Sequence, residues 1–334
     1  FVGRSLVITE IAGPGFMKIN TTFRKTYRRA LAIYISLTAI QYALLRLSGL
    51  NKSDSLITSL SNISTAGLMN LNNGNIISYG LAVKIIITTF AFMSSLNFSI
   101  LLLATMRKFR ELTEGPELKF HSGRILTTAI FITGILYITY NRSISSLKEF
   151  GNVLMQVNSY FTTAGYQISD TSRWPGAACA IILVQMFIGA CAISSGGGIK
   201  AARTIIALKT ASRTLYHHIH KNAIRPIKYA GTPLKLNTLL RCNLYIVMFV
   251  VTFLFGALIL SINLDLNTAL STSLAMLTNT GTYINQTATT GILDDYSVVS
   301  KITMMFLMLA GRLEIYPIIL IFFKSFWKND NDFF

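Results

Sequence analysis

The chain has few charged residues for its length, and acidic residues are especially scarce. Only 13% of its 334 residues are Asp, Glu, Lys or Arg, whereas 52% are hydrophobic. A soluble domain usually carries about a quarter charged residues, so this share is roughly half the norm. The deficit argues against a soluble protein and favours a chain that is surrounded by lipid.

Cysteine is scarce as well, with Cys179, Cys191 and Cys242 the only three. All three lie in or beside apolar stretches, and their spacing fits neither a zinc motif nor a disulfide framework. We interpret them as small buried residues. No pattern in the sequence indicates covalent chemistry, so we expect a protein that is not an enzyme.

Long apolar stretches, by contrast, are plentiful. Six of them are long enough, or nearly so, to cross a bilayer as a helix, which takes about 20 residues. They are 30–47, 81–106, 125–140, 176–193, 242–262 and 302–323. The sequence therefore predicts an all-α, polytopic membrane protein.

The formal net charge of +17 is concentrated between the predicted spans. Residues 18–29, 107–124 and 200–241 are basic, and the last of these ranges contains no Asp or Glu. Basic connections of this kind are typical of cytoplasmic loops, and they also attract anionic lipid. No aromatic or groove-reading element accompanies them, so we expect membrane lipids as partners and no nucleic acid.

The spans come in pairs, and each pair is joined on the acidic side by a semi-apolar stretch too short to cross. These stretches are 53–63, 147–161 and 265–277. Their length is typical of re-entrant segments. We expect Ser53 with Asp54, and Asp265, to begin the first and third helices as caps or favourable acids.

Each short stretch ends in a segment that contains Ser or Thr and a glycine. The three segments are Ser64, Thr65, Ala66 and Gly67; Thr162, Thr163, Ala164, Gly165 and Tyr166; and Thr278, Asn279, Thr280 and Gly281. A helix that stops inside a membrane must present its last carbonyls to something polar, and a cation suits their partial negative charge. Potassium filters use backbone carbonyls of such segments, and glycine allows the conformation. We predict a K⁺ filter at these residues, with K⁺ as the transported ion and no covalently bound cofactor.

A run of glycines follows the apolar helix predicted at 174–193. The run comprises Ser194, Ser195, Gly196, Gly197 and Gly198, and a basic amphipathic helix begins at Ile199 and Lys200. Each glycine costs about 1 kcal/mol in a helix interior, so the run should be unwound. It is either an intramembrane loop that gates a pore, or an ordinary helix end with Lys200 among the headgroups. The residues alone leave both interpretations open.

Arg312 lies in the middle of the last predicted span. A central arginine is costly in lipid, so it should face the protein interior and be paired. It could donate hydrogen bonds to carbonyls of residues 194–198 and so brace a gate. The alternative is a structural pairing with Glu314 or with helix carbonyls.

Several motifs resemble the TrkH/TrkG/KtrB/HKT superfamily of potassium transporters, and most closely its bacterial TrkH and KtrB members. Residues 189–200 (GACAISSGGGIK) and 311–317 (GRLEIYP) match the signatures of the third and fourth units of that superfamily. Residues 10–14 (EIAGP) and 95–98 (SLNF) resemble the linker after the first unit and a stretch in the second. The resemblance covers nearly the whole chain.

This resemblance implies a pseudo-fourfold cation-channel fold built from repeated helix–pore loop–helix units, three of which are recognisable. The expected divisions are 1–26, the end of unit one and a linker; 27–106, unit two; 107–122, a cytoplasmic linker; 123–207, unit three with its broken second helix; 208–237, a basic cytoplasmic loop; and 238–328, unit four. The first unit is expected upstream of Phe1.

The resemblance further implies potassium uptake across the plasma membrane, the inner membrane in bacteria, with residues 194–198, Lys200 and Arg312 forming the gate. It implies a homodimer and a cytoplasmic nucleotide-binding regulatory subunit of the TrkA/KtrA type. Leu68 and Thr282 stand where the superfamily often has Phe or Tyr, which leaves K⁺ versus Na⁺ preference open. The alternative is an ion-coupled secondary transporter for K⁺ or Na⁺ with broken helices, but the common orientation of the units favours a pore.

Overall fold

The computed structural model describes residues 23–67, 76–105, 115–140, 146–171, 174–220, 226–281 and 296–321. These residues are mostly helical, and the other regular elements among them are a short hairpin of β1 (Lys228–Tyr229) and β2 (Thr232–Pro233) and a single 3-10 turn, η1 (Ile76–Ser78). The helical membrane fold expected from the sequence is therefore confirmed. The motif at 10–14, Leu68 and Thr282 lie outside the described residues.

Three long helices form the first members of the helix pairs. They are α2 (Phe23–Leu47), α7 (Pro116–Thr139) and α11 (Leu236–Leu260), and within the described ranges these three are long and apolar enough to cross a membrane. Helix α7 begins well before the apolar run at 125, because Glu117, His121 and Arg124 lie on its buried face. Pro116 fits its first turn, where a missing amide hydrogen costs nothing.

A short helix follows each long one and packs against it. These helices are α3 (Lys52–Ile63), α8 (Ser146–Phe161) and α12 (Leu266–Leu277). Asp265 caps α12 as expected, since its carboxylate accepts a hydrogen bond from the Thr268 amide. In α3 the expected acid is present: Asp54 lies in the first turn, where negative charge is favourable, while the N-cap position is Asn51, which makes no side-chain cap.

The second helix of every pair is broken. The halves are α4 (Leu81–Ser95) and α5 (Phe98–Thr105), α9 (Gly176–Ile188) and α10 (Ala201–Ile219), and α13 (Val298–Arg312) and α14 (Ile315–Ile321). The continuous spans expected at 81–106 and 302–323 are therefore wrong. At the first break Leu96 is extended and the Phe98 amide bonds to the Ile193 carbonyl, while at the last Glu314 adopts a φ of 61°.

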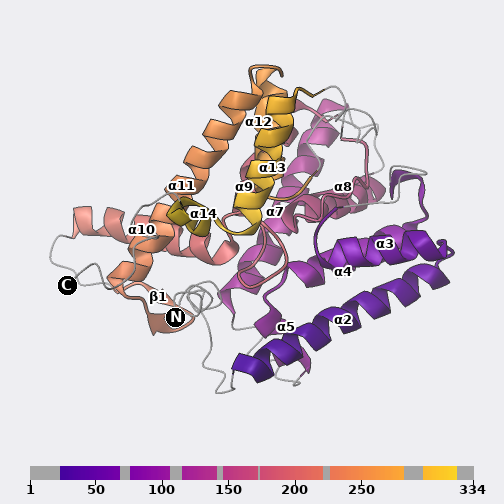
Figure 1. Cartoon of the computed structure of the whole chain (residues 1–334), viewed down its shortest axis with the longest axis horizontal. Helices are drawn as coiled ribbons and strands as arrows, with labels where there is room; N and C mark the ends of the chain where they lie inside the picture. Colours follow the sequence, from indigo (N-terminus) through magenta and orange to yellow (C-terminus); the bar gives the residue numbers. More distant parts are fainter. Residues whose placement is uncertain are drawn as a thin grey trace.

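The helices form three groups that follow the order of the chain (Figure 1). Helices α2, α3 and α4 pack together at one side, α11, α12 and α13 pack together at the other, and α7, α8 and α9 lie between them. Contacts of α4 with α8 and of α9 with α12 join the groups. This arrangement turns the ends of the three short helices toward the middle of the molecule.

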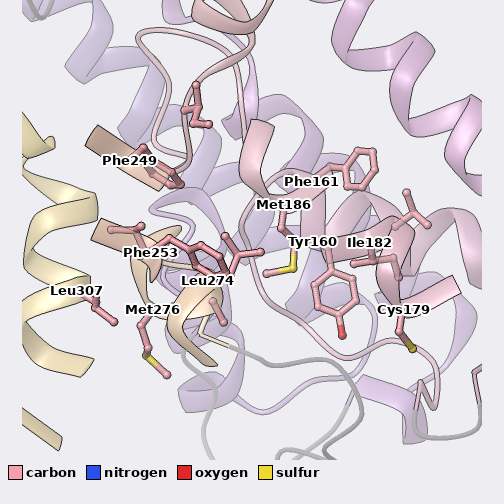
Figure 2. Packing of buried hydrophobic residues seen from close by; sticks show 14 of the residues in the cluster. Tyr160, Phe161, Cys179, Ile182, Met186, Phe249, Phe253, Leu274, Met276 and Leu307 are labelled. Carbon is pink, nitrogen blue, oxygen red and sulfur yellow. The ribbon is translucent and has the colours of Figure 1, made fainter. Parts of the chain in front are cut away.

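The main apolar core joins the second and third groups. Figure 2 shows Met186 of α9 between Tyr160 of α8 on one side and Phe253 of α11 and Leu274 of α12 on the other. The ring of Phe187 packs edge-on against Phe253, with 4.8 Å between the centroids. The three cysteines are buried, as expected, and they form no disulfide with one another.

Large apolar side chains also cover the outer face of α11. They include Leu240, Leu244, Val247, Val251, Leu254, Phe255 and Leu258, all exposed to the surroundings. Soluble proteins rarely expose so continuous an apolar face, which lipid covers at no cost.

Candidate functional site

The short helices α3, α8 and α12 end in the same unusual backbone conformation. The second residue after each helix has a φ of 54°, 57° or 56°, and the glycine two positions later has a φ of 68°, 70° or 80°. The former residues are Thr65, Thr163 and Asn279, and the latter are Gly67, Gly165 and Gly281. A left-handed conformation is rare for a β-branched residue and persists only where its surroundings impose it.

The hydrogen bonds of these loops repeat as well. Between the two left-handed residues, an amide donates back to a carbonyl in the last turn of the preceding helix. The bonds are Ala66 to Ser61 at 2.8 Å, Ala164 to Ser159 at 3.0 Å and Thr280 to Ala275 at 2.9 Å. The three segments predicted from the sequence thus have the same pattern of backbone hydrogen bonds. In each of them a loop amide bonds to the helix that precedes the loop.

The three loops also meet one another. A Cβ atom added to Gly67 would lie 2.8 Å from the carbonyl oxygen of Ala164 and 3.3 Å from that of Thr280. These three residues come from different helix pairs. The three loops therefore meet at these residues, and the two carbonyl oxygens leave no room for a side chain at position 67.

Buried polar side chains of α8 hold the loop that follows this helix, which is the middle one of the three loops. Gln156 accepts hydrogen bonds from the amides of Ile168 and Ser169, at 2.7 and 2.9 Å. Its amide group donates to the carbonyl of Tyr166, which also accepts from the Ser159 hydroxyl at 2.7 Å. The sequence analysis did not single out Gln156, which is fully buried. A glutamine within a semi-apolar re-entrant stretch is a signal that could have been used, because a polar group there needs a hydrogen-bond partner.

The unwound segment begins earlier than the sequence indicated. Helix α9 ends at Ile188, so the helix expected at 174–193 is wrong in its last five residues. Gly189 has a φ of 65°, and the chain folds back so that the Ala190 amide bonds to the Gly197 carbonyl at 3.2 Å. A Cβ atom on Gly189 would collide with that carbonyl oxygen. The non-helical segment is therefore 189–200.

This segment lies against the bases of all three loops. The Thr65 hydroxyl donates to the Ser195 carbonyl at 2.8 Å, and the Gly197 amide donates to the Thr163 hydroxyl at 2.8 Å. A side chain on Gly197 would collide with the carbonyl oxygen of Thr278. Residues 189–192 and 196–199 of the segment are buried, which favours a loop held within the protein over an ordinary helix end.

Two basic side chains hold the same segment. Lys200 donates to the Gly196 carbonyl, and Arg312 donates to the Ser195 carbonyl at 2.7 Å. Arg312 is exposed at the end of α13, so its expected place inside an unbroken span is wrong, because the helix stops there. Glu314 pairs with Arg203 at 2.5 Å instead of with Arg312.

Long apolar helices together with short apolar helices define a multi-pass helical membrane protein. The chain belongs to the TrkH family of cation transport proteins, whose sequence profile matches residues 5–330. The resemblance drawn from its motifs is thereby confirmed.

Characterised relatives align over almost the whole chain. It is 27% identical over 335 residues to the Trk system potassium uptake protein TrkH of Halomonas elongata, covering 98% of this chain and 68% of that protein. It is 26% identical over 333 residues to TrkH of Escherichia coli K12, with the same coverage. The crystal structure of the potassium transporter TrkH from Vibrio parahaemolyticus has the same fold, with a TM-score of 0.84 at 24% identity over 97% of this chain and 70% of that one.

Proposed function

We propose that this protein takes up K⁺ across the membrane through a pore whose filter is made of backbone carbonyls. The observation that carries the proposal is the meeting of three loops of identical backbone conformation at Gly67, Ala164 and Thr280. Carbonyl oxygens replace the water shell of K⁺ in such filters. The relatives named above are potassium uptake proteins, which supports the choice of ion.

The proposed filter uses the segments predicted from the sequence. They are Ser64, Thr65, Ala66 and Gly67; Thr162, Thr163, Ala164, Gly165 and Tyr166; and Thr278, Asn279, Thr280 and Gly281. The C-terminal ends of α3, α8 and α12 add partial negative charge, which favours a cation at this point. A pseudo-fourfold pore contains four such loops, and the described residues supply three.

The proposed gate is the segment at 194–198 with Lys200 and Arg312. Hydrogen bonds with Thr65, Thr163 and Arg312 hold it across the bases of the loops. Two positive side chains attached to it would repel a cation that leaves the filter. Ions would therefore pass only when the segment moves aside.

The assembly follows from the family resemblance. We propose a homodimer in a lipid bilayer, regulated by a nucleotide-binding subunit of the TrkA/KtrA type on the basic cytoplasmic side. The protein would perform no covalent chemistry on the ion.

Replacing Gly67 by Ala tests the filter. The new Cβ would press on the Ala164 carbonyl in a backbone conformation that costs alanine about 1–3 kcal/mol, so K⁺ uptake should fall about tenfold or more. Uptake is measured in cells that lack their own K⁺ uptake systems and express the complete gene. Gly134→Ala in α7 is the matched control, because nothing lies within 4 Å of a Cβ there. Unchanged uptake and K⁺/Na⁺ selectivity in Gly67→Ala would rule out the proposed filter.

A further inference from the structure

One face of α7 holds the unwound segment at several points. Glu117, His121 and Arg124 are spaced one helical turn apart, and all three are buried. Arg124 donates to the carbonyls of Gly189 and Gln185, at 2.5 and 3.2 Å. These two bonds satisfy main-chain carbonyl oxygens that have no hydrogen-bond partner within the helix where α9 ends.

His121 extends this contact to the break after α4. Its Nδ1 lies 3.1 Å from an Arg124 nitrogen, and its Nε2 lies 3.1 Å from the Ser95 hydroxyl. Because a guanidinium only donates, Nδ1 must accept, so Nε2 carries the proton and donates to Ser95. The Ser95 carbonyl in turn accepts from the Cys191 amide at 3.1 Å.

Glu117 has a different arrangement, because its carboxylate oxygens bond to the unwound segment and to strand β1, and the carboxylate also has a hydrogen bond with the Asn97 side chain at the break after α4. One oxygen accepts from the Ala192 amide, in the unwound segment, at 3.2 Å. The other accepts from the Tyr229 hydroxyl, in strand β1, at 2.5 Å. Glu117 is 7% exposed and Tyr229 is 2% exposed, so neither group has water as a ready substitute. Burial, together with the Glu117 carboxylate, raises the pKa of the Tyr229 hydroxyl, which keeps it protonated as the donor.

The hairpin that carries Tyr229 lies in the basic connection between α10 and α11. It has two residue pairs and a turn at Ala230 and Gly231, both with positive φ. A two-stranded hairpin is marginally stable at best on its own, so its order depends on what it packs against. Tyr229 and Ile227 share an apolar cluster with Ala192 and with Ile206 of α10.

We infer that Glu117 is a positioning residue that couples the 227–234 hairpin to the 189–200 segment, so that displacing the hairpin releases the segment. The inference rests on the proposed gating role of that segment. In the described conformation Tyr229, Glu117 and Ala192 are all engaged while the segment lies across the loops. The contact therefore favours the closed arrangement, and its loss favours the open one.

The test uses Tyr229→Phe in the complete protein reconstituted in liposomes. This change keeps the ring and removes only the bond to Glu117. Hydrogen–deuterium exchange at 189–200 should rise about tenfold, as expected for losing a buried hydrogen bond to a charged group, and K⁺ flux should rise severalfold. Tyr137→Phe, at a position of α7 that is 40% exposed, is the matched control and should change neither.

A second variant, with exchange also measured in α11, distinguishes a loss of the coupling from a general loss of structure. Glu117→Leu removes both acceptor oxygens at similar side-chain size, so it should loosen the hairpin and the segment together while exchange in α11 stays unchanged. Exchange at 189–200 that matches the control in both variants would overturn the coupling. If the segment loosens but neither Tyr229→Phe nor Arg312→Ala raises flux, the coupling stands and the proposed gate falls.

Discussion

At the residue scale, backbone strain is concentrated around the proposed pathway. Within the described ranges, seven non-glycine residues have a positive φ: Thr65, Thr163, Ile193, Lys200, Ala230, Asn279 and Glu314. All but Ala230, in the hairpin turn, lie in the three loops, in the unwound segment or at the break after α13. Each such conformation costs of order 1–3 kcal/mol, and surrounding structure must hold it. The strained residues therefore lie where contacts from surrounding segments impose the backbone conformation most strongly.

Gln156 is the side chain that we expect to hold the middle loop in shape. Gln156→Leu would leave the buried amides of Ile168 and Ser169 without their acceptor, which costs about 1–3 kcal/mol for each group. We expect a lower melting temperature in detergent and weaker discrimination of K⁺ from Na⁺. Asn263→Ala is the control, because its hydrogen bond to Ser297 is exposed and should contribute little. Equal melting temperatures and selectivity for the two variants would contradict this role.

At the element scale, the three helix pairs repeat one design: a long helix, a short helix that stops, and a broken helix. Each break lies beside the 189–200 segment or is bonded to it. Ser195 donates to the Ser94 carbonyl at the end of α4, and Arg312 at the end of α13 donates to the Ser195 carbonyl. Freed main-chain groups at membrane depth need such partners, so the breaks and the segment stabilise one another.

The cap of α12 predicts a pH-dependent contribution to stability. Hydrogen bonds from the side chain and amide of Thr268 lower the pKa of Asp265 below its ordinary value. The stabilisation is therefore present at neutral pH and is lost as the pH falls through the lowered pKa. Asp265→Ala should lower the melting temperature at pH 7, and the difference from the unchanged protein should shrink in acid. Asp265→Asn should retain most of the cap, since asparagine is also a good N-cap residue.

Melting curves between pH 7 and pH 3 check this expectation. Asp54→Asn is a suitable comparison, because Asp54 lies in the first turn of α3 and is not its cap. A difference between Asp265→Ala and the unchanged protein that persists undiminished in acid would contradict the assignment.

At the scale of the whole molecule, the proposed pore and the alternative carrier predict different ion fluxes. The loops after the three short helices meet, and one segment lies against them, as the proposed pore requires. A secondary transporter would instead cycle between two closed arrangements around a midplane site. We expect K⁺ flux through liposomes containing the complete protein to exceed the turnover of a carrier cycle. Flux that saturates at carrier rates would favour the secondary transporter. The K⁺ flux of liposomes that contain the Gly67→Ala variant serves as the background value.

The short helices and their glycine loops could be predicted from the sequence because their causes are local. Apolar length sets where a helix can enter and stop, Asp265 caps α12, and Gly67, Gly165 and Gly281 permit the left-handed turns. The contact between Arg312 and the glycine run was also expected, since a charge in that span needs a partner.

Only the tertiary structure decided where the long spans break and what holds the unwound segment. The end of α9 at Ile188 depends on Arg124, some sixty residues away, as the bond to Gly189 shows. Glu117 looked like one more charge in a cytoplasmic linker until the fold brought Ala192 and Tyr229 to its two oxygens. Local pattern fixes what a segment can form, but hydrogen bonds between distant segments decide where a helix inside a membrane must end.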